Sequence, residues 1–271
     1  MSKPPPRILS IAGSDSSGGA GIQADIKTIT MLGGYAMTAI TAVTAQNTRG
    51  VQGVEVMPPG FVMAQVESCL SDIGADAIKI GMLGSPEIAR HLAKRLDTFT
   101  GAIVFDPVMV ATSGSSLASA ETIAAFGDLM QIATVVTPNL PELAALTGRE
   151  QLDEEDVFDA ARELAQAQDT IVLAKGGHGD GDEVIDRVIS PSGKLASYGH
   201  ARIDTRHTHG TGCTLSAALA TLLGHGQPLV NAIRLARGFT FAAIENAPGF
   251  GEGHGPLGHQ AVRKLEDPRE A

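Results

Sequence analysis

Strand-like and helix-like segments alternate along most of this chain, and the alternation restricts the folds that it can adopt. Short apolar segments typical of buried strands lie at 7–13, 35–44, 77–83, 102–110, 134–137 and 170–174. Segments with helical spacing of apolar residues lie at 22–32, 61–72, 86–96, 121–130 and 153–167. A further helix is expected to follow residues 138–142 and to end at 147. Strand, helix and next strand form the repeating unit of parallel sheets. The pattern therefore predicts an α/β fold with a mainly parallel sheet and helices on both faces.

The remaining segments predict additions to this sheet. Residues 51–57 alternate apolar and polar side chains, which predicts a half-exposed strand that would serve as a small flap. Residues 183–189 and 194–203 flank a Pro-Ser-Gly turn and predict a hairpin. A last helix is expected over 228–246, and the glycine- and histidine-rich tail at 251–271 is expected to be frayed in part.

Composition and charge argue against several classes of protein. The 271 residues carry a formal net charge of −10 and a pI near 5.2, which disfavours a nucleic acid or an anionic membrane as partner. Cys69 and Cys213 make no disulfide framework, the start of the chain has no apolar signal segment, and no apolar run approaches membrane-spanning length. We expect one cytoplasmic domain over 1–271, with its core at about 7–247 and a tail at 248–271.

A glycine-rich loop that becomes a helix stands at 208–220. Leu215, Ala218, Leu219, Leu222 and Leu223 share one helical face, and Gly224 is a plausible end for that helix. The spacing predicts a helix that starts near Gly212–Cys213.

The first backbone N–H groups of such a helix have no partner within it, so they can bind an anion. Gly210 and Gly212 have no side chains, which would let the anion come close. Cys213 stands at the positive end of the helix, where a thiol is more easily ionised. An anion site beside a potential base suits phosphoryl transfer to a hydroxyl. The alternative is an ordinary helix start with a buried cysteine.

Polar loops follow the expected strands, at 13–21, 44–48, 81–84, 106–114, 137–142 and 175–179. Because the carboxyl ends of parallel strands meet at one edge of a sheet, we expect these loops to form one rim. Asp25 is expected on the apolar face of the helix at 22–32, where a carboxylate is costly unless it is paired or binds a ligand. The alternative is an acid in the first helical turn that the helix dipole favours.

Several common motifs are absent or weak. The chain has no Gly-x-x-x-x-Gly-Lys-Ser/Thr, and the glycines at 13–21 depart from the spacing of dinucleotide-binding loops. No other residue of a metal-binding type lies near His207 and His209 at a suitable spacing in the sequence. His209 is therefore expected to shape the glycine-rich loop that would bind the anion. The remaining histidines, among them His91, His254 and His259, are expected at the surface.

Six segments in this order resemble the hydroxymethylpyrimidine and phosphomethylpyrimidine kinases of thiamine biosynthesis, which belong to the ribokinase superfamily. They are AGSDSSGGAGIQAD at 12–25, TAVTAQNT at 41–48, KIGML at 79–83, TPNLPE at 137–142, KGGH at 175–178 and THGTGC at 208–213. The match runs from about 7 to 246, and the tail beyond it matches nothing. One mild departure is Pro107 in the segment DPVM at 106–109, which stiffens that loop.

The resemblance implies a ribokinase-like three-layer α/β/α sandwich with its active site along one edge of the sheet. It also implies ATP and magnesium as cofactors, and phosphorylation of 4-amino-5-hydroxymethyl-2-methylpyrimidine and then of its monophosphate. A homodimer is expected from the family alone.

The resemblance also implies roles for single residues. Cys213 would be the base that takes the hydroxyl proton, and Gly210, Thr211 and Gly212 would bind the transferring phosphoryl group. The substrate would lie against Asp25, Gln46, Met82, Val108, Gly13 and His209, and the side-chain amide of Gln46 suits an amino group beside a ring nitrogen. The nucleotide would lie against Asn139, Lys175, Gly177 and Thr211.

Asn139 and Glu142 resemble the superfamily's Asn-x-x-Glu, which organises magnesium, often through water. The alternative is a capping arrangement with Asn139 as N-cap and Glu142 at the third helical position.

Two other functions stay open at the level of the sequence. A kinase for pyridoxal, pyridoxine or another vitamin-like alcohol would use the same scaffold. A non-catalytic pyrimidine sensor is the alternative of another class, and Cys213, the glycine loop and the Asn139/Glu142 pair argue against it.

Overall fold

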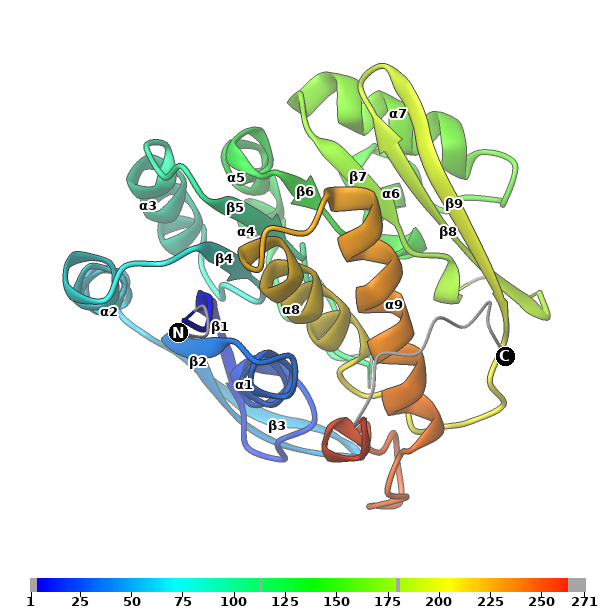
Figure 1. The fold of residues 1–271 in the computed structure, drawn as a ribbon, viewed down its shortest axis with the longest axis horizontal. Helices are drawn as coiled ribbons and strands as arrows, with labels where there is room; N and C mark the ends of the chain where they lie inside the picture. The colour runs from blue at the N-terminus through cyan, green and yellow to red at the C-terminus, as the bar shows by residue number, and fades with distance from the viewer. Residues whose placement is uncertain (1–3, 113, 179–180, 263–271) are drawn as a thin grey trace.

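The computed structural model describes residues 4–112, 114–178 and 181–262, and Figure 1 shows three layers with a sheet between two groups of helices. The sheet has nine strands in the order β3-β2-β1-β4-β5-β6-β7-β8-β9. The six strands from β2 to β7 run parallel, whereas β3, β8 and β9 pair antiparallel to their neighbours. The predicted α/β class and mainly parallel sheet are confirmed.

Strands and helices alternate through the first two thirds of the chain. The strands are β1 (Arg7–Asp15), β2 (Tyr35–Asn47), β3 (Gly50–Val56), β4 (Ala77–Ile80), β5 (Ala102–Phe105), β6 (Val135–Val136), β7 (Ile171–Ala174), β8 (Glu183–Ser190) and β9 (Gly193–Ala201). The helices are α1 (Gly21–Met31), α2 (Pro59–Asp72), α3 (Pro86–Leu96), α4 (Ala120–Ala124), α5 (Phe126–Ile132), α6 (Leu140–Leu146), α7 (Val157–Gln168), α8 (Thr211–Gly224) and α9 (Leu229–Glu245). Short 3₁₀ turns η1 (Gly176–His178) and η2 (His259–Ala261) complete the elements.

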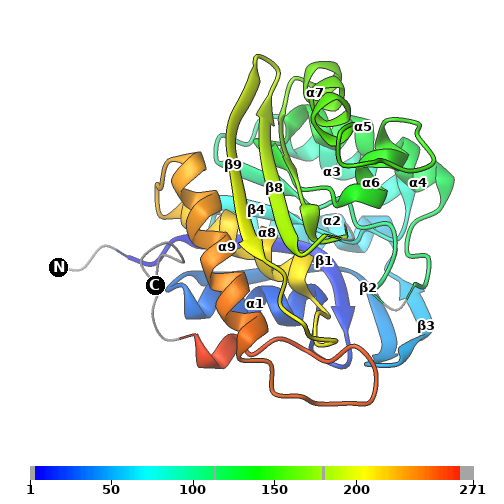
Figure 2. The same cartoon turned by 90° about the vertical axis from the view of Figure 1, so that its right-hand side faces the viewer.

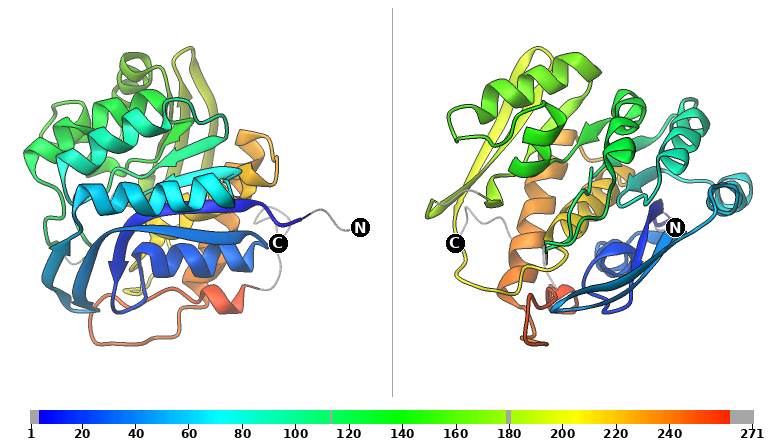
Figure 3. Two further views of the ribbon diagram at one scale, coloured as in Figure 1. Left: turned by 90° about the vertical axis from the view of Figure 1, so that its left-hand side faces the viewer. Right: turned by 180° about the vertical axis from the view of Figure 1, so that it is seen from behind.

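Each face of the sheet has its own hydrophobic core. Helices α2, α3, α5 and α7 cover one face and pack around residues such as Ile11, Ile78 and Phe105. Helices α1, α8 and α9 cover the other face, and Figures 2 and 3 show α8 between the sheet and α9. Since α8 is covered on several sides, all nine residues from Thr214 to Leu222 are buried. A helix with a single apolar face, as the sequence predicts, would have left its other face exposed to solvent.

Other expected elements differ from the structure at their ends. The segment 121–130 is not one helix but two, α4 and α5, which meet at Ala125. The strand expected over 102–110 ends at Phe105, and the polypeptide then leaves the sheet through Asp106 and Pro107. The acidic residues at 153–156 are exposed, as expected, and precede α7 rather than open it.

The predicted flap is β3, an edge strand that pairs only with β2 among the described strands. Its residues from Gln52 to Val56 are all exposed, so more of its surface is wet than the half that the alternating pattern predicts. The hairpin of β8 and β9 is confirmed at the opposite edge. Within the described residues, no helix has the length and apolar content needed to cross a membrane.

The segment that follows α9 is packed against the protein up to residue 262, so the described part of the tail that was expected to be frayed in part is ordered by backbone hydrogen bonds. His254 N–H donates to Thr48 O (2.9 Å), His209 N–H donates to Gly255 O (3.1 Å), and Gly258 N–H donates to Ala243 O (2.8 Å). Figure 2 shows this segment running along the lower edge of the molecule before it returns to η2. Residues 263–271 lie outside the described part of the chain.

Candidate active site

The loops that follow the parallel strands meet at one edge of the sheet, as predicted, and hydrogen bonds join them in pairs. Strand β2 itself meets the loop after β4 where Thr41 Oγ1 donates to Met82 O (2.6 Å). The loops after β6 and β7 meet at a bridge between Asn139 and Lys175. Residue 179, at the end of one expected loop, lies outside the described residues.

Asp15 organises the loop that follows β1. Its carboxylate accepts hydrogen bonds from the N–H groups of Ser17 (2.8 Å), Gly19 (3.1 Å) and Ala20 (2.8 Å). His209 Nε2 lies 2.8 Å from Asp15 Oδ2, and both side chains are buried. Burial raises the pKa of Asp15, but the hydrogen bonds from His209, Ser17 and the loop N–H groups outweigh that effect and leave the pKa below its usual value. Asp15 was not among the predicted site residues, although an acid at the end of an apolar strand was a usable signal.

The glycine loop lies at the N-terminus of α8, which begins at Thr211, one residue before the predicted start. Gly210 is the N-cap with φ +89°, a conformation that favours glycine. A Cβ at Gly210 would overlap Gly19 O, so the loop after β1 and the start of α8 lie in contact. A Cβ at Gly212 would lie 3.3 Å from both Asp106 Oδ2 and Lys175 Nζ. The start of α8 thus lies next to an ammonium and a carboxylate that are paired with each other. The free N–H groups of the first helical turn are themselves suited to bind an anion.

Cys213 is half-buried in the first turn of α8. The sequence predicted a thiol that ionises easily, and this is wrong for the protein without ligand. Burial raises the pKa of Cys213 to about 11, and the Lys79 ammonium and the Gly21 N–H oppose only part of that rise. Loss of water is therefore the largest influence on the pKa of this thiol.

Asp25 is paired inside the protein. Lys79 Nζ donates to Asp25 Oδ1 (3.1 Å) and Oδ2 (2.9 Å), and Ser10 Oγ donates to Oδ2 (2.6 Å). Neither side chain of the pair has exposed surface. The sequence left two roles open for a carboxylate on this face, pairing with a charged group and binding a ligand. The structure shows pairing, and Asp25 has no exposed surface through which it could bind a substrate directly. Lys79 was missed as a site residue, although a lysine inside the apolar strand Ala77–Ile80 was a clear signal.

A second charged cluster lies beside the first. Lys175 Nζ donates to Asp106 Oδ1 (2.9 Å) and lies 3.9 Å from Glu142 Oε2. Thr137 Oγ1 also donates to Asp106 Oδ1 (3.0 Å). Burial raises the pKa of Glu142 to about 7, and Lys175 opposes that rise. Lys175, Asp106 and Glu142 therefore form one charged cluster, and Lys175 lies next to the start of α8.

Asn139 and Glu142 form the capping box that was the alternative to a magnesium site. Asn139 Oδ1 accepts the Glu142 N–H (2.9 Å), and Glu142 Oε2 accepts the Asn139 N–H (2.8 Å). Among the described residues, no group of three or more His, Cys, Asp or Glu side chains lies close enough to hold a metal ion.

The other expected substrate residues lie around the ends of β1, β2 and β4. Gln46 Oε1 accepts from Thr44 Oγ1 (3.1 Å), and Gln46 Nε2 lies 3.5 Å from His209 Nε2. Gly13 lies against Met82, because a Cβ at Gly13 would lie 3.0 Å from the Met82 sulfur. Val108 is half-buried at the exit of β5, and the exposed Gly177 lies after β7, where its O accepts from Arg202 Nη1 (2.9 Å).

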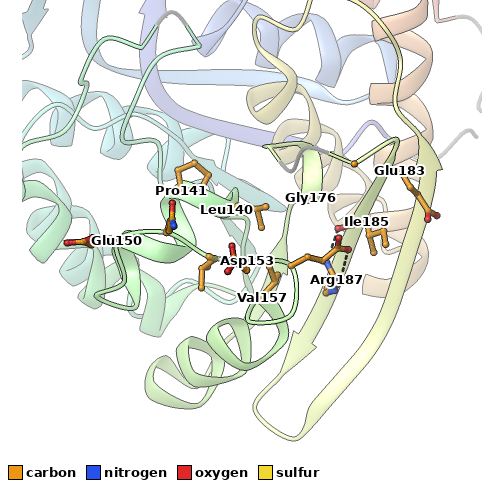
Figure 4. A pocket seen from close by; sticks show the side chains of 13 residues that line it. Leu140, Pro141, Glu150, Asp153, Val157, Gly176, Glu183, Ile185 and Arg187 are labelled. Atoms are coloured by element: carbon orange, nitrogen blue, oxygen red, sulfur yellow. Dashed lines mark hydrogen bonds and ion pairs between the residues drawn. The ribbon is translucent and has the colours of Figure 1, made fainter.

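Two hollows border this region. One of about 330 Å³ lies between the start of α6, the segment before α7, and β8, and is drawn in Figure 4. Its lining includes Glu150, Asp153, Glu154 and Glu183, so it disfavours phosphate, and its Arg187 is paired with Glu154 (3.0 Å). The other, of about 300 Å³, lies between Val54 and Val56 of the flap, Met82, Gly84 and residues 116–119.

One histidine, His259, was expected at the surface but is buried. His91 and His254 are exposed, as expected, but His259 is 1% exposed and lies against α8. Its Nε2 lies 2.8 Å from Thr214 Oγ1, one residue after Cys213. The sequence missed this residue because it stands in a segment that was expected to be frayed.

Comparison with known proteins gives consistent matches over nearly the whole chain. A family model described as phosphomethylpyrimidine kinase matches residues 15–258. The chain is 46% identical to the hydroxymethylpyrimidine/phosphomethylpyrimidine kinase of Rhizobium meliloti, over 93% of this chain and 96% of that protein. It is 43% identical to a multifunctional thiamine biosynthesis protein of Corynebacterium efficiens and to a bifunctional one of Geobacter sulfurreducens, and it spans 36% and 54% of their lengths.

Solved structures share the fold. The structure of Bacillus subtilis pyridoxal kinase in an ADP complex is similar with a TM-score of 0.87 and 35% identity, covering 95% of this chain and 98% of that one. Phosphomethylpyrimidine kinase from Clostridium difficile 630 is similar with a TM-score of 0.76 and 38% identity, covering 88% and 99%. The sandwich is thus the ribokinase-like one that the sequence implied, and the chain belongs to the phosphomethylpyrimidine kinase family.

Proposed function

We propose that this protein transfers the γ-phosphoryl group of ATP to 4-amino-5-hydroxymethyl-2-methylpyrimidine, and then phosphorylates the monophosphate to the diphosphate. The observation that carries the proposal is the glycine loop at the start of α8: on one side His209 lies 3.5 Å from Gln46, and on the other a Cβ at Gly212 would lie 3.3 Å from Lys175 Nζ. An acceptor and a phosphoryl donor bound on these two sides would meet at the glycine loop.

Cys213 is the proposed base for the hydroxymethyl proton, and Gly210, Thr211 and Gly212 would bind the transferring group through backbone N–H donors. A thiol with a pKa of about 11 is only about one part in ten thousand thiolate at pH 7. The thiolate is nevertheless a strong base when it forms. The rate of the chemical step is therefore expected to rise with pH through the neutral range.

On the nucleotide side, Lys175 would neutralise phosphate charge, and Gly177, Thr211 and Asn139 would border the nucleotide. Asn139 and Glu142 would organise magnesium through water, while Asn139 Oδ1 and Glu142 Oε2 also accept the backbone N–H groups of the capping box. Magnesium bound with ATP would supply charge neutralisation on the phosphates. Glu142 would keep the magnesium-bound phosphates in place next to the ammonium group of Lys175.

On the acceptor side, Gln46 would bind the amino group and ring nitrogen of the pyrimidine, with Met82, Val108 and Gly13 against the ring and His209 beside the amide. Leaving one such buried polar group unpaired costs about 1–3 kcal/mol, roughly a 5- to 150-fold preference. Gln46→Leu should raise KM for the pyrimidine far more than KM for ATP. An equal rise in both would show that Gln46 does not bind the acceptor.

A pyridoxal-type kinase is the second candidate, because pyridoxal kinase structures from Bacillus subtilis and Staphylococcus aureus share this fold at TM-scores of 0.87. Mass spectrometry of the products formed from ATP, magnesium and a panel of alcohols separates the two. The main proposal fails if pyridoxal is phosphorylated with a higher kcat/KM than the aminopyrimidine. It fails in part if the monophosphate accumulates and no diphosphate forms.

We also propose that residues 1–271 act as one domain, as a homodimer in the cytoplasm. The two cysteines are unpaired, which suits a reducing compartment. Val43, Val54 and Phe61 expose apolar surface on and near the flap, where a second copy would cover it. Light scattering after size exclusion would show twice the chain mass, and a monomer at micromolar concentration would contradict the dimer.

A further inference from the structure

An aspartate of β8 and an arginine of α9 form an ion pair to which the proposed reaction gives no role. Arg237 Nε donates to Asp186 Oδ2 (2.7 Å), and the two side chains are only 11% and 9% exposed. A buried ion pair adds little stability compared with apolar side chains of the same size, since both charges lose their water. The pair therefore calls for a reason other than stability.

The place of Asp186 in β8 favours an apolar residue. Successive side chains of a strand point to opposite faces, so Asp186 shares its face with Val184 and Val188. Both valines are buried, and Val188 belongs to the core on the side of the sheet that α8 and α9 cover. A carboxylate among such neighbours is costly unless a specific contact needs it.

The second oxygen of this carboxylate holds the loop that follows β7. The Gly176 N–H donates to Asp186 Oδ1 (2.8 Å), and this hydrogen bond is buried. A Cβ at Gly176 would overlap Ile185 O, so the loop lies with its backbone directly against β8. Gly176 stands between Lys175 and Gly177, the two residues of this loop that are proposed to meet the nucleotide. Asp186 thus fixes the backbone between them.

The arginine in turn fixes the orientation of the carboxylate. Arg237 Nη2 donates to Tyr198 O (3.2 Å), and its guanidinium carbon lies 5.1 Å from the centre of the Tyr198 ring. Tyr198 is the residue of β9 that pairs with Asp186 of β8. The carboxylate is therefore held from α9 and β9 through one oxygen, while its other oxygen accepts the N–H of the loop.

Two adjacent glycines make this loop hard to order by other means. They have no side chains that could pack, and glycine loses more conformational freedom than any other residue when it is ordered. The neighbouring anchors are the Lys175 N–H, which donates to Pro138 O (2.9 Å), and Gly177 O, which accepts from the exposed Arg202 (2.9 Å). A loop that is ordered before the nucleotide arrives binds it more tightly, because binding then orders fewer groups.

We propose that Asp186 is a positioning residue for nucleotide binding. Its carboxylate, held by Arg237, fixes the Gly176 N–H and so keeps the loop after β7 in its binding conformation before ATP arrives. The inference rests on the proposed nucleotide role of this loop, but the property that it predicts is the affinity for ATP, which is measured without an acceptor.

The test is the dissociation constant of ATP with magnesium, measured by isothermal titration calorimetry. Two double variants remove both charges of the pair and differ in one group. Asp186→Asn/Arg237→Met keeps an oxygen that can accept the Gly176 N–H, whereas Asp186→Leu/Arg237→Met has a side chain of similar shape without an acceptor. The variant without the acceptor should bind ATP roughly 5- to 30-fold more weakly, which corresponds to the ordering of one residue.

Steady-state kinetics separate positioning from a merely structural role. KM for ATP should differ between the two double variants by a similar factor, whereas KM for the aminopyrimidine should be the same in both. A pair that only stabilises the fold would change the unfolding temperature of the two variants without this difference between the two KM values.

A third variant covers the case in which Asp186→Leu/Arg237→Met does not fold because the Gly176 N–H is buried without a partner. Asp186→Ala/Arg237→Met leaves room for a water molecule, which can accept the N–H without fixing the loop. This variant should also bind ATP more weakly than Asp186→Asn/Arg237→Met.

Two results would overturn the inference. One is an equal dissociation constant for ATP with and without the acceptor oxygen at position 186. The other is an equal rise in KM for ATP and KM for the aminopyrimidine. The product measurement on the panel of alcohols is separate: if the aminopyrimidine is not phosphorylated, the proposed function is wrong, while the ATP dissociation constants still decide whether Asp186 positions the loop.

Discussion

The buried imidazole of His259 should make the stability of the protein depend on pH in a way that one substitution removes. The side chain is 1% exposed and contacts Thr214 in the first turns of α8. Burial, and to a smaller extent the positive charge of Lys27, lower the pKa of His259 from 6.5 to about 4. In the folded protein the ring therefore stays neutral well below the pH at which the unfolded chain takes up a proton.

The sign follows from where the proton binds. Between pH 6.5 and 4 the unfolded state holds a proton at position 259 that the folded state lacks, so stability falls as pH falls through this window. Above 6.5 both states are neutral there and the contribution is constant. From about pH 7.5 to about pH 5, these two pKa values correspond to a loss of about 2 kcal/mol in the free energy of unfolding.

His259→Gln is the informative variant. A glutamine amide nitrogen can take the place of Nε2 beside Thr214 Oγ1, but it does not titrate. Glu142, whose pKa is raised to about 7, acts in the opposite direction, because the folded state then holds a proton that the unfolded state releases. Since Glu142 is present in both proteins, its effect cancels in the difference between them.

The measurement is urea unfolding at the two pH values. The chain has no tryptophan, so far-ultraviolet circular dichroism is the suitable signal. Wild type should lose about 2 kcal/mol more than His259→Gln on going to the lower pH, with similar m-values. Equal losses in the two proteins would refute the argument, because His259 would then have the same pKa in both states.

Three further predictions concern the site. Cys213→Ala should lower turnover by roughly two to four orders of magnitude in an ADP-release assay, with little change in ATP affinity, and near wild-type turnover would make Cys213 structural. Glu142→Gln keeps a residue type that serves in a capping box, so it should raise the magnesium concentration for half-maximal rate; a loss of stability at unchanged magnesium dependence would leave only the capping role. The exposed strand β3 should gain protection from hydrogen exchange when substrate and nucleotide are both bound, and unchanged protection would make it an ordinary edge strand.

The sheet and the loops at its edge could be predicted from the sequence because their signals are local. Apolar segments such as Ala77–Ile80 and a Pro-started helix such as Pro86–Leu96 specify their own structure. Helix α3 begins and ends where the pattern predicts. The split between α4 and α5 was not predictable, since the spacing of apolar residues continues across Ala125.

The site was only partly predictable because its energetics depend on partners far apart in the chain. Cys213 was found from its glycine loop, yet its raised pKa results from burial that the local sequence does not reveal. Asp25 was recognised as a misplaced carboxylate, but Lys79, which pairs with it, is 54 residues away. For Glu142 the sequence left two roles open, and the hydrogen bonds with Asn139 confirm the capping box without testing magnesium.

The contact between Asp15 and His209 has a consequence for how the protein is made. The two residues are 194 apart, and His209 is in turn held by the backbone of Gly255. At roughly 5–20 residues per second, a ribosome makes His209 about 10–40 s after Asp15. During that time β1 and β2 can pair, but the loop between β1 and α1 lacks its histidine. The contact between this loop and the start of α8 is therefore completed only when translation of the described chain is nearly finished, and nascent chains stopped before Gly255 should not bind substrate.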